Sequence, residues 1–363
     1  MKHKIEHHGL LNANSYIRRC FVGRTHTPTL VLLQRLLFSA FFTSLFLVIL
    51  FLLQHSRSAN QSLSDPLEPV TVVNVPPYNL LPVHLVCTND NCTLNFLHWI
   101  QIRSIESFIN HSRIYLHVFG DPIQNYWFNK LSSSLSLVYH NKTYYEYLSP
   151  KYKVTSLAHL ADFIRFDVMC EHGGIYLDMD EIPLKSWDPL LSQLIEPIDT
   201  ILGEEPTKVP GLQIAAMIAY PKSWIMCEMS KQQGLEYDNS WIKHSIKLIR
   251  KLHLETVDAD PQTILVHGSE AFVPIGYTRA QTDLLYRLRP KQQLNFENSY
   301  ALHVSEKQYL RGAKMSVNSV LHEDRNFYRA IRPIVTEGIA SKELKLTDAL
   351  DDDDLNEFLK KRR

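Results

Sequence analysis

The sequence lacks an excess of charge of either sign and contains few cysteines and glycines. Its 363 residues carry 38 basic and 38 acidic side chains, so the formal net charge is zero. A protein that coats nucleic acid needs positive charge to release counterions from the phosphates, so we expect no nucleic-acid partner. Twelve glycines and 18 prolines exclude collagen-like and low-complexity chains. Five cysteines are too few for a small domain held together by disulfides.

One long hydrophobic run is present near the N-terminus. Residues 36–53 (LLFSAFFTSLFLVILFLL) contain no charged side chain, and fourteen of these eighteen residues are Leu, Ile, Val or Phe. About twenty helical residues cross a bilayer. Together with the apolar residues that precede Gln34, the run predicts a transmembrane helix over residues 31–53. We expect an uncleaved signal anchor, because a cleaved signal peptide has a shorter apolar core and less chain ahead of it.

The charges that flank this run predict its orientation. Five basic residues precede the span against the single Glu6: Lys2, Lys4, Arg18, Arg19 and Arg24. The positive-inside rule therefore places residues 1–30 in the cytosol as a short tail and everything after residue 53 in the lumen, as in a type II membrane protein.

The chain beyond the span has features of a lumenal protein. Four Asn-x-Ser/Thr sequons follow it, at Asn60, Asn91, Asn110 and Asn141. Residues 54–82 are polar and dotted with prolines, which predicts a stem. Four cysteines follow the stem, Cys87, Cys92, Cys170 and Cys227. An oxidising lumen permits disulfides between them, with three possible full pairings, whereas their spacing does not suggest a zinc site.

The fold class follows from the alternation of strands and helices after the stem. Residues 83–87 and 113–119 are expected to be strands, and residues 96–108 have the apolar spacing of a helix between them. Strand, helix, strand predicts a doubly wound α/β domain, which we expect over residues 83–335. Residues 336–363 read as a charged, solvated tail.

Residues 155–187 (TSLAHLADFIRFDVMCEHGGIYLDMDEIPLKSW) contain the most informative pattern. Apolar residues at helical spacing predict a helix that ends at Gly173-Gly174, because glycine adopts a left-handed conformation without penalty. Asp162 and Arg165 lie together on the flank of this helix. A short buried strand, residues 175–177, leads directly into Asp178-Met-Asp180.

The position of the two aspartates suggests a cation site. Open α/β sheets bind ligands at the carboxyl ends of their strands, and two carboxylates there could hold a hard divalent cation that bridges a diphosphate. A bare Asp-x-Asp is not specific, since the same pattern occurs at residues 258–260 and within residues 351–354. The preceding helix, glycine pair and strand distinguish Asp178 and Asp180. Taken alone, Asp162 and Arg165 could be an ordinary ion pair on a helix surface.

The string Asp162-x-x-Arg165, followed by Gly173-Gly174-Ile-Tyr176-Leu-Asp178-x-Asp180, resembles the DxD sugar-binding region of glycosyltransferase family 32. It is similar in particular to the Golgi α-1,4-galactosyltransferase and α-1,4-N-acetylglucosaminyltransferase group. Residues 270–275 (EAFVPI) and 299–304 (SYALHV) are similar to two further segments of that family, in the same order.

The resemblance implies a GT-A-type, Rossmann-like domain that binds a nucleotide sugar. It implies a type II enzyme of the Golgi membrane with its catalytic domain in the lumen, which transfers a hexose or N-acetylhexosamine from a UDP-sugar to a glycan or glycolipid with retention, giving an α-linkage. UDP-galactose and UDP-N-acetylglucosamine are the candidate donors. The cofactor it implies is a divalent cation, expected to be Mn²⁺, which would neutralise the departing nucleoside diphosphate.

The resemblance also implies which residues form the site. The expected donor-binding residues are Asp162, Arg165, Gly173, Gly174, Tyr176 and Asp178. The expected metal ligands are Asp178, Asp180 and His303. An alternative for His303 is a histidine packed within a strand between Leu302 and Val304. The motif names no catalytic nucleophile or base.

Two other functions stay open. The segments that would shape the acceptor pocket depart from the family at residues 211–214, at Trp241-Ile-Lys-His244-Ser and at Ser305. A catalytically weak relative that serves as a lumenal binding or assembly partner would show such departures. A strand that ends in Asp-x-Asp also opens the site of haloacid-dehalogenase phosphohydrolases, but Ile182 stands where that motif requires Thr or Val, and the glycine pair has no role in that chemistry.

Overall fold

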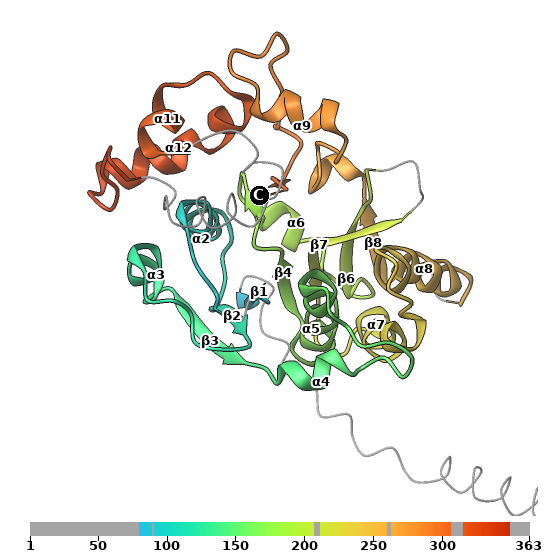
Figure 1. Cartoon of the computed structure of the whole chain (residues 1–363). Helices are drawn as coiled ribbons and strands as arrows, with labels where there is room; N and C mark the ends of the chain where they lie inside the picture. Colours follow the sequence, from blue (N-terminus) through green and yellow to red (C-terminus); the bar gives the residue numbers. More distant parts are fainter. Residues whose placement is uncertain (1–79, 89–90, 207–210, 260–262, 306–314, 349–363) are drawn as a thin grey trace, which may run out of the picture. The chain divides into compact units, whose positions relative to one another are not determined.

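The computed structural model describes residues 80–88, 91–206, 211–259, 263–305 and 315–348 (Figure 1). All of them belong to one compact unit, Asn74–Arg363. The predicted cytosolic tail (1–30), transmembrane helix (31–53) and nearly all of the stem (54–82) lie outside the described residues. Among the residues that are described, none of the helices has the length and apolar character needed to cross a bilayer.

A seven-stranded sheet in the order β3-β2-β1-β4-β7-β6-β8 forms the centre of this unit. Its strands are β1 (Val83–Cys87), β2 (Ile114–Val118), β3 (Leu135–Tyr139), β4 (Gly174–Leu177), β6 (Thr200–Glu204), β7 (Leu212–Ala219) and β8 (Ile264–His267). The strands β3, β2, β1 and β4 are parallel, β6 is parallel to β8, and β7 runs antiparallel to both of its neighbours. Since the chain leaves β1 on one side for β2 and later returns on the other side as β4, the carboxyl ends of β1 and β4 form a topological switch point, where such sheets bind ligands.

Helices cover both faces of the sheet (Figure 1). One face packs against α2 (Phe96–Phe108) and α3 (Tyr126–Leu131), with α11 (Val317–His322) and α12 (Asn326–Ala340) in the same core. The other face packs against α5 (Leu157–His172), α7 (Trp224–Glu236) and α8 (Leu248–Ala259). Alternate residues of β1 enter the two cores, as the period of two of a strand requires. The predicted α/β class is confirmed.

The remaining elements are short. They are α4 (Lys142–Glu146), α6 (Asp188–Leu191), the π-helix η2 (Lys243–Lys247), the 3₁₀ turn η3 (Ser269–Ala271), α9 (Arg279–Tyr286) and a separate antiparallel pair of strands, β5 (Glu181–Pro183) and β9 (Ala301–His303). The pair β5–β9 brings segments about 120 residues apart in the sequence into contact directly after Asp180.

The local signals of the sequence place several elements accurately. The strand at residues 83–87 and the helix at residues 96–108 have the expected bounds, and the strand expected over 113–119 covers Ile114–Val118. The side chain of Asn95 accepts hydrogen bonds from the first turn of α2 and so fixes its start. At the other end of the chain, the expected boundary between residues 335 and 336 falls inside α12, and Leu344 beyond it is buried in the core.

The four cysteines after residue 83 form two disulfides, Cys87–Cys92 and Cys170–Cys227. The first closes the turn that follows β1. The second ties the last turn of α5 to α7, on the face of the sheet that carries the candidate site. The structure thus selects one of the three pairings that the sequence left open.

Candidate functional site

Two glycines set the connection between α5 and β4. Gly173 has a φ of +59° and Gly174 a φ of +104°, which L side chains rarely adopt. A Cβ atom on Gly173 would lie 2.4 Å from the backbone nitrogen of Pro221, and one on Gly174 would lie 2.6 Å from the carbonyl oxygen of Pro82. Gly174 begins β4 and Asp178 follows its end, roughly 13 Å along the strand. The two glycines therefore allow close packing of this connection, and the donor contact that the resemblance implies for them stays a prediction.

A buried guanidinium connects the helix to the strand. Arg165 Nη2 lies 3.0 Å from Asp162 Oδ1 and 3.0 Å from Asp178 Oδ1. Its Nη1 donates to the carbonyl oxygen of Ile214 at 2.7 Å, and its guanidinium carbon lies 4.7 Å from the ring centroid of Tyr176. The side chain of Arg165 is 5% exposed and that of Asp162 is 10% exposed. The alternative of an exposed helix-surface pair is therefore wrong, because β4, β7 and η2 cover this flank of α5.

The charges of this network shift one another's pKa values. Burial lowers the pKa of Arg165, but Asp178, Tyr176 and Asp162 outweigh burial and raise it above its ordinary value. Burial raises the pKa of Asp178, an effect that Arg165 opposes and Asp180 reinforces. Tyr176 donates its hydroxyl hydrogen to Asp178 Oδ1 at 2.7 Å. Asp178 is thus oriented by Arg165 and Tyr176, while its side chain stays 24% exposed.

Three of the predicted residues form a group that could hold a metal ion. Ligand atoms of Asp178, Asp180 and His303 all lie within 4.8 Å of one another. His303 Nε2 lies 3.1 Å from Asp180 Oδ1, and Asp180 is 21% exposed. Two carboxylates and an imidazole suit Mn²⁺ and related divalent cations. The residues present therefore fit the cation that the sequence pattern implies, and the alternative of His303 as a merely packed strand histidine does not account for its contact with Asp180.

Negative charge accumulates around this group. Burial lowers the pKa of His303, but Asp180, Glu181 and Asp178 outweigh it and raise the value to about 10. Burial also raises the pKa of Glu205, an effect that His303 opposes, so a further carboxyl lies within reach of the same imidazole. A site with this excess of carboxylates attracts a dication before it can receive a diphosphate.

His244 belongs to the site although the sequence reading did not include it. Its Nε2 lies 3.1 Å from Asp162 Oδ2, and its fully buried ring packs edge-on against His159 and Tyr237. His244 lies on the π-helix η2. Such helices are rare in proteins, and those that occur are often at functional sites. The only sequence signal was that residues 241–245 depart from the family pattern.

Glu181 is a second residue that the sequence reading missed. Its side chain is 0% exposed, and neither carboxyl oxygen has a hydrogen-bond partner among the described residues. Burial raises the pKa of this carboxyl well above its ordinary value, an effect that His303 opposes and Asp180 reinforces. Gln101 on α2 fixes the backbone here, because its Nε2 donates to the carbonyl oxygens of Asp178 at 2.5 Å and of Glu181 at 2.9 Å.

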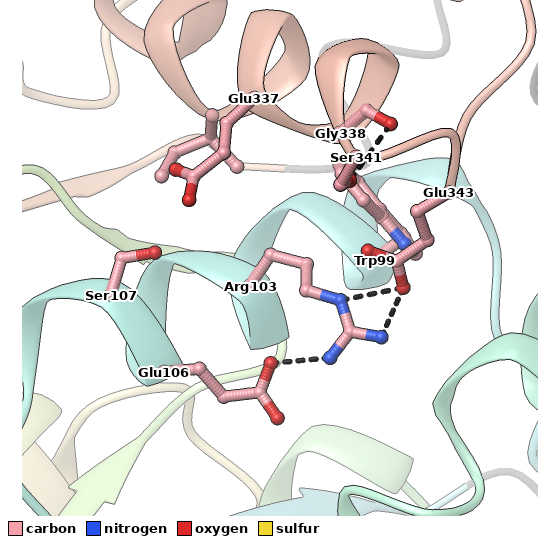
Figure 2. Close-up of a pocket in the computed structure, with 9 residues that line it drawn as sticks. Trp99, Arg103, Glu106, Ser107, Glu337, Gly338, Ser341 and Glu343 are labelled. Atoms are coloured by element: carbon pink, nitrogen blue, oxygen red, sulfur yellow. Dashed lines mark hydrogen bonds and ion pairs between the residues drawn. The ribbon is translucent and has the colours of Figure 1, made fainter.

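A separate cavity of about 310 Å³ lies between α2 and α12 (Figure 2). Arg103 lies on its wall and pairs with Glu106 and Glu343, as the dashed lines in Figure 2 show. Trp99 and Arg103 face this cavity from the side of α2 nearly opposite to Gln101, about 160° around the helix axis. Among the described residues that line it, none belongs to the predicted site, and Arg103 is already paired with two of its carboxylates.

Comparison with known families gives one match. Residues 101–195 match the model of a glycosyltransferase sugar-binding region containing a DXD motif. The match spans 95 of the 363 residues and includes Asp162, Arg165, Asp178 and Asp180, but neither His244 nor His303. It supports a glycosyltransferase as the general class, and with it the binding of a nucleotide sugar and a divalent metal. No curated protein matches this sequence.

Several solved glycosyltransferases have similar chain traces. GlyE of Streptococcus pneumoniae TIGR4 is 14% identical, with 72% of this chain and 64% of that chain covered and a TM-score of 0.41. The galactosyltransferase LgtC in complex with donor and acceptor sugar analogues is 12% identical, with 71% and 96% covered and a TM-score of 0.36. Mouse xyloside xylosyltransferase 1 is 11% identical, with 53% and 86% covered and a TM-score of 0.32. At such TM-scores the general class rests on the family match.

Proposed function

We propose that this protein is a metal-dependent, retaining glycosyltransferase of family 32 with a GT-A-type domain. It would transfer a hexose or N-acetylhexosamine from a UDP-sugar, with UDP-galactose and UDP-N-acetylglucosamine as candidate donors, to a glycan or glycolipid. The observation that carries the proposal is that Arg165, Asp178, Asp180 and His303 converge at the carboxyl end of β4. The complete set of metal ligands favours an active enzyme over a catalytically weak relative.

The exposed fractions of the side chains indicate which of them can contact a ligand and which hold the others in place. Asp178 and Asp180 are partly exposed and can reach a ligand, whereas Asp162, Arg165 and Tyr176 are buried behind them. Arg165 is already neutralised by two carboxylates, so its task is to orient Asp178 rather than to bind a diphosphate directly. His244 and Arg165 together hold Asp162, one at each carboxyl oxygen.

A divalent cation held by Asp178, Asp180 and His303 would stabilise the negative charge that develops on a leaving nucleoside diphosphate. The chain supplies the rest of the site through rigid elements: the end of β4, the strand pair β5–β9 and the first half of α5. Gln101 donates hydrogen bonds to the backbone on both sides of Asp180. These bonds limit the movement of the Asp180 side chain. Such preorganisation is what electrostatic catalysis requires.

We also propose a type II protein of the Golgi membrane with this domain in the lumen. Two disulfides support it, because disulfides persist in oxidising compartments. The sequon residues Asn91, Asn110 and Asn141 are all exposed, as acceptors of glycans must be. The hydrophobic run at residues 31–53 would be the anchor.

Thermal stabilisation tests the proposed function. Full-length protein in detergent is heated with a panel of UDP-sugars in the presence of Mn²⁺. A donor at a hundred times its dissociation constant should stabilise the fold by about 2.7 kcal/mol. Asp180→Ala should abolish both this shift and Mn²⁺-dependent hydrolysis of the UDP-sugar. Asp283→Ala, which removes an exposed acid from α9, is the matched control and should behave like wild type. A wild-type protein that neither binds nor hydrolyses any UDP-sugar would contradict the proposal.

A further inference from the structure

The carboxyl of Glu181 is buried beside the candidate metal ligands with its hydrogen-bonding capacity unused. Its side chain is fully buried, and both of its oxygens lack a hydrogen-bond partner within the described part of the chain. Leaving a buried acceptor unsatisfied destabilises a fold, and more so when the group is charged. A fold tolerates that cost where the group finds its partner in another state of the protein.

The pairing of β5 with β9 shows where that partner lies. Glu181 stands directly opposite His303 in this antiparallel pair. Side chains of opposed residues project from the same face, with Cβ atoms about 4.5–5.5 Å apart. The charges of the two side chains act on one another. His303 also has an unused atom, since its buried Nδ1 has no hydrogen-bond partner among the residues described, while its Nε2 faces Asp180.

We propose that Glu181 is a positioning residue for the metal: its carboxylate accepts a hydrogen bond from Nδ1–H of His303 when Nε2 of the same ring binds the cation. The inference rests on the proposed metal-dependent function. A neutral imidazole carries one proton, so a metal ion on Nε2 leaves that proton on Nδ1. Metal-bound histidines usually donate it to a carboxylate or a carbonyl, which fixes the ring and makes the ligand more basic. Glu181 and His303 are placed to form this pair.

Two other roles for Glu181 make different predictions. As a direct metal ligand, Glu181 would contribute to binding whether or not His303 is present, yet its oxygens are not part of the group of ligand atoms that lie within 4.8 Å of one another. As a purely structural residue, it would affect stability and leave the affinity for metal unchanged. A thermodynamic cycle with His303 separates the three roles.

The experiment is a Mn²⁺ titration of the full-length protein without donor, followed by the electron paramagnetic resonance of free Mn²⁺. Wild type, E181Q, H303A and the double variant are compared. We expect E181Q to weaken Mn²⁺ binding roughly 10- to 100-fold. The double variant should bind no more weakly than H303A alone, because without the imidazole Glu181 has nothing to orient. In EDTA, the melting temperature of E181Q should equal or exceed that of wild type, since an uncharged amide replaces a buried carboxyl.

Three results would overturn the inference. If E181Q binds Mn²⁺ like wild type while Asp180→Ala does not, the inference fails and the proposed function stands. If E181Q weakens binding equally in the H303A background, Glu181 is an independent ligand. If wild type binds no Mn²⁺, the proposed function fails and the inference with it. Should E181Q not fold, E181D tests the same contact, because it keeps the charge but withdraws the carboxylate by one methylene; its loss of affinity should likewise vanish without His303.

Discussion

Two neighbouring parts of the site differ in how their polar groups are satisfied. In the part formed by α5 and β4, Arg165 is surrounded by Asp162, Asp178 and a carbonyl oxygen at 2.7–3.0 Å. In the part formed by β5 and β9, both oxygens of Glu181 and one nitrogen of His303 have no partner among the described residues. The first part pairs its buried cation, Arg165, without a ligand and acts as a scaffold, and we call it the complete part. The second adjoins Asp178, Asp180 and His303, the group that could hold a metal ion, and we call it the incomplete part.

The largest effect on stability should come from removing Arg165, the central side chain of the complete part. Arg165→Met leaves the buried carboxyl of Asp162 and the partly exposed carboxyl of Asp178 without their shared partner. Removing one member of a buried ion pair destabilises a fold by about 3–5 kcal/mol, so we expect a loss of this size in urea unfolding. Lys222→Met removes an exposed cation that pairs with Glu171 at the surface and should change stability by less than about 1 kcal/mol. Equal losses in the two variants would refute the scaffold role.

Breaking the incomplete part should affect activity and spare stability. Asp180→Asn keeps the shape of the side chain but removes a charge that the cation needs. We expect sugar transfer or UDP-sugar hydrolysis to fall roughly 10²- to 10³-fold, as for loss of one electrostatic stabiliser of a transition state. The unfolding free energy without metal should change little, because the weaker repulsion at Asp178 is offset by the loss of the ion pair with His303. A variant that is both inactive and unstable would contradict the assignment of stability to one part and ligand binding to the other.

A variant of His244 tests whether the complete part is separate from the metal group. His244→Phe keeps a ring within the aromatic contacts of His159 and Tyr237 but removes the hydrogen bond to Asp162. A hydrogen bond to a charged group is worth about 1.5–3 kcal/mol, which is the expected loss of stability. Affinity for Mn²⁺ should stay within about twofold of wild type, because Asp162 does not contact the metal group. The exposed His322→Ala serves as control. A large drop in Mn²⁺ affinity would show that the two parts are not separate.

The smallest effect concerns histidines of the sheet that are hydrogen-bonded in their neutral forms. His84 Nδ1 lies 3.0 Å from His117 Nε2, and His117 Nδ1 lies 2.8 Å from His140 Nε2. Burial lowers the pKa of His84 to about 3, with a further contribution from His172, and lowers the pKa of His117 to about 2, with further contributions from His84 and His140. Both values lie below the ordinary pKa of about 6.5 for an exposed histidine.

Acid should therefore weaken the fold through these two side chains. Between the folded and unfolded pKa values the unfolded chain binds more protons, so stability decreases as the pH falls below about 6.5. We expect a loss of about 1 kcal/mol per histidine between pH 7 and 5.5, measured by urea unfolding. His117→Gln should reduce this pH dependence relative to wild type. A pH dependence unchanged in the variant would show that His117 is not held neutral.

The sequence predicted the parts of the fold and site that depend on local signals. The first strand and the helix at residues 96–108 followed from apolar spacing, and the Gly173-Gly174 turn from the conformational freedom of glycine. These signals lie within a few residues of the elements they specify, and so does the order of Asp162, Arg165, Asp178 and Asp180. The resemblance supplied His303, which no local pattern indicates.

The burial of the site could not be predicted in the same way. Whether Asp162 and Arg165 are exposed depends on β7 and η2, which pack against the flank of α5 from far along the chain. The register of β9 decides that Glu181 faces His303, and no pattern within residues 178–183 reports it. His244 depends on a π-helix, whose extra residue per turn shifts every side chain relative to an ordinary helical spacing.

The strand pair β5–β9 has a consequence for gene models and isoforms. A product that ends before residue 301, or that skips the segment around it, would keep the whole of residues 101–195 and would still be counted as a glycosyltransferase by its motif. It would lack the imidazole of His303 and the whole of strand β9, so the side chain of Glu181 would no longer be buried by the opposite strand. We expect such shortened products to be inactive, so isoforms of this protein should be checked for His303 as well as for the two aspartates.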